Sequence, residues 1–312
     1  MRVRSTWVIL STSVFLVSTC GKKEEPPNRG DSTSPAVRTS GKTDSAAPPN
    51  LEGLVLIPAG VFKMGDTLDG MGEAPAHEVT VSGYFMAKCE VTRSLWDAVR
   101  AWGVSHGYTD LPEGEGKSAI HPVHSVRWYE VVKWCNAYSE KTGLTPCYTV
   151  SDAIYKTGDS EPDCNWGANG YRLPTEAEWE KAARGGQSGK RYPWGDGIGT
   201  NKANYKYNHN PWASGSKPYT SPIGSYPANS YGLYDMEGNL AEWCWDWWGS
   251  LETTSQTDPR GPVSPSTRVG RVTRGGCWFS DALYCRVAYR DGASPNLAID
   301  LIGFRVTRSS VP

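Results

Sequence analysis

Several features that commonly reveal function are scarce in this sequence, and each absence argues against a class of protein. The 312 residues carry 32 Lys and Arg against 33 Asp and Glu, so the net charge of −1 gives no electrostatic footprint for nucleic acid. No two of the eight cysteines have the Cys-x-x-Cys spacing, which argues against a zinc ribbon or a thioredoxin-like motif. No glycine-rich phosphate loop and no alternation of strands with helices is visible, which favours α+β over parallel α/β architecture.

The apolar run at the N-terminus is too short to cross a bilayer stably. Residues 7–17 follow two arginines, as the apolar core of a signal peptide does. The Val-Ser-Thr-Cys sequence that ends this stretch resembles a bacterial lipobox. It predicts a signal peptide over 1–19 and a diacylated Cys20 as the mature N-terminus. Simple secretion is the alternative, because Thr19 is larger than the Gly or Ala that usually precedes such a cysteine.

Residues 21–50 contain one Val and no aromatic residue, so they cannot bury enough apolar surface to fold. We predict that residues 20–50 form a lipid-bearing, disordered tether and that residues 51–312 form one large domain. These features predict a protein of the bacterial cell envelope, on the periplasmic or extracellular face. Its contact with the membrane would be through the lipid anchor only.

The composition of the domain predicts much irregular backbone. Fourteen Trp and sixteen Tyr stand against five Phe, with 34 Gly and 22 Pro. Helical periodicity and capping signals predict helices over 93–102, ending at Gly103, over the stretch from 126 to 143, and over 176–184. Strands are expected at 54–57, 61–65 and 77–81. The sequence therefore predicts an α+β fold with few regular elements and much irregular loop.

An acidic, glycine-containing stretch precedes a run of alternating tryptophans. Asp235, Gly238, Asn239 and Glu242 place several oxygen donors within eight residues, a composition that suits a hard cation such as Ca²⁺. The tryptophans at 243, 245 and 247 have the period of a strand with one aromatic face. The alternative interpretation is a turn followed by a buried core strand.

The cysteine count leaves a disulfide possible. If Cys20 carries lipid, seven cysteines remain, and an odd number leaves at least one unpaired unless a partner chain supplies another. Cys147 and Cys164 flank a polar segment that reads as a hairpin or excursion. We predict a disulfide between them, which would contribute roughly 3 kcal/mol by loop-closure entropy.

Many motifs in order resemble the formylglycine-generating enzyme (sulfatase-modifying factor) family. The resemblance runs from about residue 54 to residue 306. It rests on IPAGVFKMGD, KCEVTRSLW, HPVHSVRWYEVVKWCN, GYRLPTEAEWEKAARGG, YPWGD, YGLYDMEGNLAEW, RVTRGGCW, CRVAYR and IGFRV. It implies a variant of the C-type-lectin-like fold, rich in irregular structure and supported by calcium.

The resemblance implies positions for two calcium sites. One set of ligands would be the side chains of Asp235 and Glu242 and the carbonyl oxygens of Gly238 and Leu240. The other would begin with Asn204 and the carbonyl of Tyr205. The acidic ligand of that second set falls near Gly215, where the sequence has no carboxylate.

The resemblance also implies a copper centre, but its thiolate pair is incomplete here. Active members of the family hold Cu(I) between two cysteines spaced C-x4-C after an RGGS motif, and soft thiolates suit Cu(I). Counted from the arginine of RGGCWFSDALYCR, the first position is Ser280 and the second is Cys285. Counted from the C-terminal side, Cys285 matches a non-catalytic position. The Ser and Trp of the family's oxygen pocket become Cys277 and Ala241. Cys277 and Cys285 remain as a conceivable alternative pair.

Two functions stay open. The first is a membrane-tethered, calcium-stabilised domain that lacks the copper oxidase activity and binds a protein or glycan partner. The second is a divergent, copper-dependent oxidase that acts on a sulfatase-type peptide and converts its cysteine to formylglycine, using Cys277 and Cys285.

Overall fold

The computed structural model describes residues 52–70, 73–207, 210–265 and 270–310. The predicted signal peptide, the lipidated Cys20 and the tether over 20–50 lie outside these residues. Within the described part of the chain, none of the helices combines the length and apolar character needed to span a bilayer.

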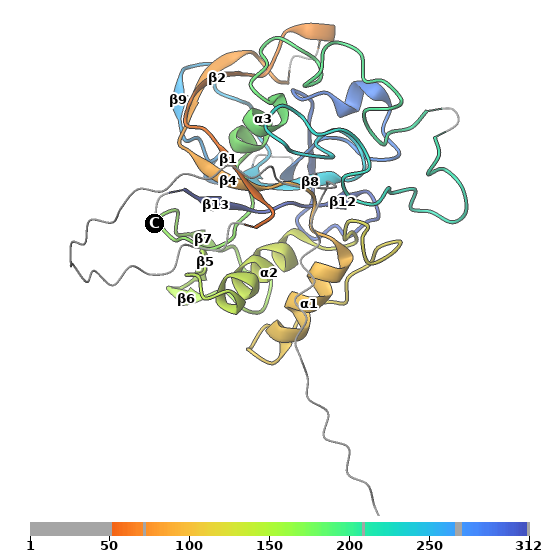
Figure 1. The fold of residues 1–312 in the computed structure, drawn as a ribbon. Helices are drawn as coiled ribbons and strands as arrows, with labels where there is room; N and C mark the ends of the chain where they lie inside the picture. The colour runs from red at the N-terminus through yellow and green to blue at the C-terminus, as the bar shows by residue number, and fades with distance from the viewer. Residues whose placement is uncertain (1–51, 71–72, 208–209, 266–269, 311–312) are drawn as a thin grey trace, which may run out of the picture.

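The described chain is an α+β structure of short elements joined by long loops (Figure 1), as predicted. The α-helices are α1 (Arg93–Val104), α2 (Trp128–Lys141) and α3 (Glu176–Arg184), and 3-10 helices cover Leu68–Gly70 and Ala282–Cys285. The strands are β1 (Leu54–Ile57), β2 (Gly60–Met64), β3 (His77–Val81), β4 (Tyr84–Ala87), β5 (Tyr148–Val150), β6 (Ala153–Ile154), β7 (Asp163–Cys164), β8 (Ala241–Trp247), β9 (Gln256–Thr257), β10 (Arg271–Arg274), β11 (Arg290–Ala293), β12 (Ile302–Gly303) and β13 (Thr307–Ser309).

Strand β8 occupies the middle of the molecule and positions the residues discussed below. It belongs to a sheet of order β11-β10-β8-β12, in which β10 is antiparallel and β12 parallel to it. The other sheets have the orders β1-β4-β13, β2-β3-β9 and β6-β5-β7. In Figure 1, α1 and α2 lie on one side of β8 and β12, and α3 and β2 lie on the other.

The helix termini follow the capping signals in the sequence, with one exception. The Thr175 hydroxyl accepts from the backbone N–H of Glu178 (3.2 Å), and Gly185 ends α3 at φ 56°, a conformation that glycine adopts readily. The exception is α1, which continues to Val104, so the predicted stop at Gly103 was wrong. Gly103 lies inside the helix, where a Cβ would stand 3.3 Å from the Cβ of Ala137 in α2, so the absence of a side chain allows the two helices to pack closely.

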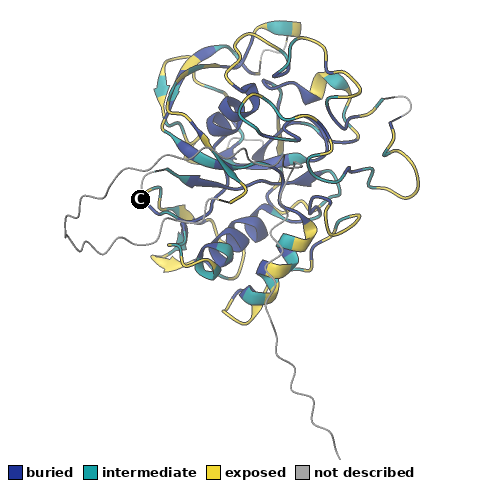
Figure 2. Cartoon of the chain, in the orientation of Figure 1, coloured by how far each residue is buried: buried dark blue, intermediate teal, exposed yellow. Residues whose placement is uncertain are grey.

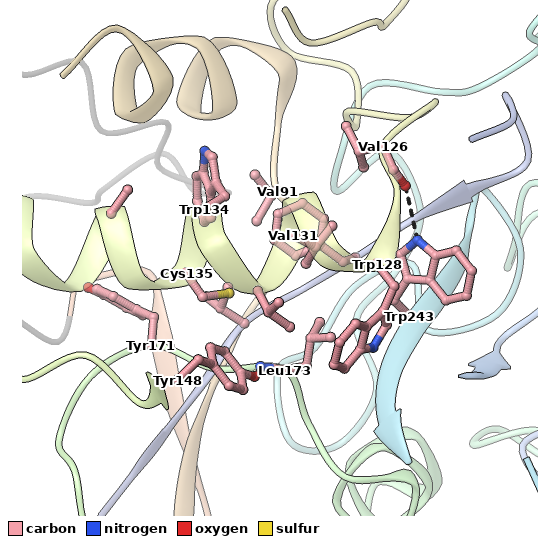
Figure 3. Close-up of a cluster of buried hydrophobic side chains, with 14 of the residues drawn as sticks. Val91, Val126, Trp128, Val131, Trp134, Cys135, Tyr148, Tyr171, Leu173 and Trp243 are labelled. Atoms are coloured by element: carbon pink, nitrogen blue, oxygen red, sulfur yellow. Dashed lines mark hydrogen bonds between the residues drawn. The ribbon is translucent and has the colours of Figure 1, made fainter. Parts of the chain in front are cut away.

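The largest core cluster forms where α1 and α2 pack against β8. Trp96 of α1 and Trp134 of α2 stack with ring centroids 5.7 Å apart. The Trp243 indole N–H donates to the carbonyl of Val126 over 3.1 Å, the dashed line in Figure 3. Cys135 lies within this cluster and is fully buried, which suits a packing role. Figure 2 shows α2 and α3 buried over most of their length, whereas α1 keeps an exposed side.

The predicted disulfide between Cys147 and Cys164 is not formed in the structure, where both are free thiols. Strand β5 pairs with β7 so that Tyr148 stands opposite Cys164, and the backbone of Cys147 faces Asn165 instead. Cys147 lies in the core cluster that contains Cys135, and Cys164 packs against the same cluster.

Candidate functional site

The acidic turn, residues 235–240, is the point where the predicted site segments meet. It adopts left-handed backbone at Asp235, Gly238 and Asn239 and leads directly into β8. The N–H of Asn239 donates to the carbonyl of Asn204 (2.7 Å), and that of Gly238 to Gly275 (2.8 Å). A Cβ at Gly238 would lie 2.2 Å from the Asn204 carbonyl, so glycine is required for this close approach. The structure therefore brings together the segments around 204, 238 and 275.

Glu242 is held by a buried arginine rather than left open to a cation. The Arg305 guanidinium donates to its carboxylate through Nε (2.7 and 2.9 Å) and Nη2 (2.6 Å). The Trp179 indole N–H donates to the second oxygen over 2.7 Å. Both carboxylate oxygens therefore already have charge-assisted or neutral hydrogen bonds. The pairing of Glu242 with Arg305 is not visible in the sequence, although both residues lie in motifs that carry the family resemblance.

Three further buried carboxylates surround this pair without an arginine of their own. Glu90 accepts from the Asn239 side chain (2.7 Å) and from the Leu240 N–H (3.0 Å). Burial, and then the charge of Asp235, hold the pKa of Glu90 well above its usual range. Burial raises the pKa of Asp235 to about 6, against a hydrogen bond from the Gly224 N–H that lowers it. Burial also raises the pKa of Glu237.

These groups supply only part of the predicted set of calcium ligands. One oxygen of Glu237 is buried without a hydrogen-bond partner in the described structure. A bound cation would satisfy this oxygen and would favour the ionised form of the buried carboxyl groups around it. The described chain brings no three His, Cys, Asp or Glu side chains together as metal ligands, so carbonyl oxygens such as those of Gly238 and Leu240 would have to contribute. Glu242 would share its carboxylate with Arg305.

The second predicted cation site does not fit. The Asn204 side-chain oxygen and the Tyr205 carbonyl both accept from the Asn210 side-chain amide, over 2.9 and 2.7 Å. Gly215 is exposed and offers no carboxylate. The two oxygens assigned to calcium are thus already satisfied by a neutral donor.

The thiols of Cys277 and Cys285 are buried, and neither is activated. Cys277 is 6% exposed, and its sulfur lies 3.3 Å from the Ser280 hydroxyl. Cys285 is fully buried and packs in a small cluster with Tyr192 and Tyr205. Burial raises the pKa of both thiols, so neither has the lowered pKa of an activated cysteine. Ser280 stands where the first thiolate of the family would be.

One surface feature was missed by the sequence analysis. The aromatic–lysine surface consists of Lys206, Lys217, Tyr219 and Phe279, beside the buried ring of Trp278. The Phe279 ring is 51% exposed and lies 5.5 Å from that of Trp278, which meets Tyr219 edge-on at 5.3 Å. Both lysine ammonium groups lie 5.4 Å from the centre of the Phe279 ring. Only the adjacent Trp-Phe pair was visible in the sequence, because the lysines come from a stretch roughly sixty to seventy residues earlier.

Comparison with known proteins identifies the class to which this fold and site belong. A family model described as "Sulfatase-modifying factor enzyme 1-like domain" matches residues 39–310. The chaperone protein LppX of Paenibacillus barcinonensis is 32% identical over 297 residues, 88% of this chain and 94% of that protein. The formylglycine-generating enzyme of Mus musculus is 30% identical over 325 residues, 94% of this chain and 86% of the enzyme.

A solved structure gives the same result. Treponema denticola variable protein 1 matches with a TM-score of 0.67 and 33% identity, covering 82% of this chain and 94% of that one. The chain therefore belongs to the sulfatase-modifying factor family, whose members include the formylglycine-generating enzymes. The predicted family and fold class are confirmed.

Proposed function

We propose that this chain is a binding member of the sulfatase-modifying factor family that does not carry out the copper-dependent oxidation. The observation that carries this proposal is the state of the thiols. Ser280 replaces one of the family's two thiolates, and Cys285 is enclosed in a cluster with Tyr192 and Tyr205. A hydroxyl is not ionised near neutral pH, so Ser280 and Cys285 cannot supply the thiolate pair that holds Cu(I).

The partner is a protein or a glycan that contacts the aromatic–lysine surface. An exposed phenylalanine flanked by two ammonium groups offers both apolar contact and hydrogen bonding, the combination found at binding surfaces. A relative named as a chaperone protein adds weight to a protein partner. Nucleic acid is not proposed, given the net charge of −1.

The setting of this module is the bacterial cell envelope, on its periplasmic or extracellular face, with the lipid on Cys20 as the anchor. A calcium ion at the acidic turn stabilises the fold. Metabolic palmitate labelling tests the anchor, because label that persists after Cys20→Ala would contradict it.

Binding can be tested with the purified domain on a glycan array and by cross-linking to bacterial envelope proteins. Phe279→Ala should reduce the retained signal about tenfold or more, since an aromatic anchor often contributes 2 kcal/mol or more to an interface, roughly a thirtyfold effect. Val263→Ala provides a matched control, because Val263 is also exposed but lies outside the aromatic–lysine surface. Equal binding by the Phe279→Ala variant and the control would contradict the proposed surface.

A divergent oxidase is the second candidate, favoured by the identity to formylglycine-generating enzymes and by the nearness of two thiols. The charge of Cys277 contributes to the raised pKa of Cys285, and a Cβ on Gly276 would lie 2.8 Å from the Cys285 sulfur. Incubation with a C-x-P-x-R peptide, copper and O₂, followed by mass analysis, separates the candidates. We expect no formylglycine. Conversion that disappears in Cys285→Ser would establish the oxidase instead.

A further inference from the structure

The side chain of Asn210 occupies the place at which the resemblance puts a calcium ion. Its amide nitrogen donates two hydrogen bonds, to the Asn204 side-chain oxygen (2.9 Å) and to the Tyr205 carbonyl (2.7 Å). Those are the two oxygens with which the predicted site begins. Asn204 is 1% and Asn210 is 8% exposed, so water competes little for these contacts.

Backbone partners fix the orientation of both amides. The N–H of Trp212 donates to the Asn210 side-chain oxygen over 2.9 Å, which turns that oxygen away and leaves the nitrogen facing Asn204 and Tyr205. The Asn204 side-chain nitrogen donates to the Tyr219 carbonyl over 2.9 Å, which leaves its oxygen facing Asn210. A backbone N–H can only donate and a carbonyl can only accept, so neither amide can be reversed without losing a bond.

We infer that the Asn210 amide substitutes for calcium and holds this region without a metal. Calcium takes six to eight oxygens at roughly 2.3–2.6 Å. Here two oxygens converge on a donor that carries partial positive charge, and position 215, where the family's carboxylate would fall, is a glycine. The amide supplies the positive end of a dipole where an ion would supply a full charge. No calcium is needed to bring Asn204 and Tyr205 together.

The consequence reaches the aromatic–lysine surface. Residues 204–207 and 210–221 contribute Lys206, Lys217 and Tyr219 to it, and the Asn204–Asn210 contact joins these two stretches. Asn204 also donates to the Asn239 side-chain oxygen (3.3 Å), which accepts from the Ser221 N–H (2.9 Å). The hydrogen bonds of the Asn204 amide therefore connect the aromatic–lysine surface to the acidic turn. The conclusion that partner binding needs no calcium at this position rests on the proposed function. The substitution of calcium by the Asn210 amide does not rest on the proposed function.

Asn210→Asp tests the substitution directly. The new carboxylate keeps its acceptor for Trp212 but places an oxygen against those of Asn204 and Tyr205, which repel it unless a cation binds. We expect calcium to raise the melting temperature of this variant by roughly 5 °C more than that of the wild type, and equilibrium dialysis to find one additional bound calcium. Asn201→Asp is the matched control, since it adds the same charge at an exposed position nearby. Identical calcium responses in the two variants would overturn the inference.

Asn210→Ala keeps the inference testable if the aspartate variant does not fold. We expect a lower melting temperature than the wild type in both calcium and chelator, with an unchanged difference between the two conditions. Limited proteolysis should cut within residues 210–221 at least several-fold faster. Wild-type stability and wild-type proteolysis in this variant would show that the amide holds nothing. A wild-type calcium stoichiometry that falls by one in Asn204→Ala would show that calcium binds there after all. None of these measurements involves a partner, so they stand apart from the test of binding.

Discussion

The acidic turn and the Asn204–Asn210 contact lie next to each other, and they satisfy buried oxygens in opposite ways. The turn gathers four carboxylates around one guanidinium, that of Arg305. The neighbouring contact uses neutral amides only. A charged cluster gains from a strong counter-charge but is sensitive to its loss, whereas an amide network is weaker and does not depend on ions. One domain therefore combines a region expected to respond to calcium with one that should not.

Removing the Arg305 guanidinium should lower the free energy of unfolding more than any of the other changes proposed for these two regions. Arg305→Met leaves Glu242 buried without its ion pair and also removes hydrogen bonds to the carbonyls of Tyr234 and Asp235. Loss of one partner of a buried pair typically lowers the free energy of unfolding by about 3–5 kcal/mol. Chemical denaturation of the wild type and the variant measures this directly.

The double variant Arg305→Met with Glu242→Gln sharpens the result. If the destabilisation arises from an unpaired buried charge, neutralising Glu242 should recover part of the loss, and the two changes will not be additive. Additive effects would show that packing, rather than charge, accounts for the role of Arg305.

Calcium removal should destabilise the acidic turn and leave the Asn204–Asn210 contact unaffected. The loss of stability should be smaller than that caused by Arg305→Met. Asp235→Asn should abolish the fall in melting temperature that a chelator causes in the wild type. At a calcium concentration one hundred times the dissociation constant, the stabilisation lost would be about 2.7 kcal/mol. Asp235 is a better target than Glu242, whose replacement would also break the pair with Arg305. Asp291→Asn is an exposed control. A chelator response of equal size in Asp235→Asn and wild type would exclude calcium from the acidic turn.

The sequence predicted secondary-structure elements far better than it predicted the hydrogen-bond partners of individual side chains. The capping box of α3 and the strand over 241–247 follow from local patterns, because a cap or a strand period is set by neighbouring residues. The resemblance located the acidic turn and the missing thiolate. It could not show that Glu242 bonds to Arg305 or that Asn210 reaches Asn204 and Tyr205, since hydrogen-bond partners depend on how distant segments pack.

The predicted end of α1 and the predicted Cys147–Cys164 disulfide were wrong for the same reason, because both depend on how distant segments pack. Glycine is an ordinary helix stop, but Gly103 lies inside α1 at the point where this helix packs closely against Ala137 of α2. A plausible loop length made a disulfide reasonable, but a disulfide also needs the two sulfurs in a specific geometry, which loop length does not show.

Asp246 extends the comparison to a buried carboxylate with neither cation nor arginine of its own. It accepts from the Glu176 N–H over 2.8 Å and lines a cavity of ≈ 400 Å³, while Arg290 is engaged by the Glu176 carboxylate. Burial, and then the charge of Glu176, raise the pKa of Asp246 to about 8, from an ordinary value of 3.8. The folded state thus binds the Asp246 proton more tightly than the unfolded state does. The contribution of this proton to the stability of the fold is complete below about pH 4 and is lost as the pH rises through about 8.

Asp246→Asn, which keeps an acceptor for the Glu176 N–H, should remove this dependence and give the smallest effect of the series. Between pH 6 and 7 the wild type should lose about 1 kcal/mol of unfolding free energy relative to the variant, close to the limit for one proton. Urea denaturation at each pH gives the difference, with Asp291→Asn as the exposed control. A difference between wild type and Asp246→Asn that stays constant from pH 5 to 8 would mean that Asp246 is ionised in the fold. Its negative charge would then need a counter-ion, as the acidic turn does, and the cavity beside it would be the place to look for one.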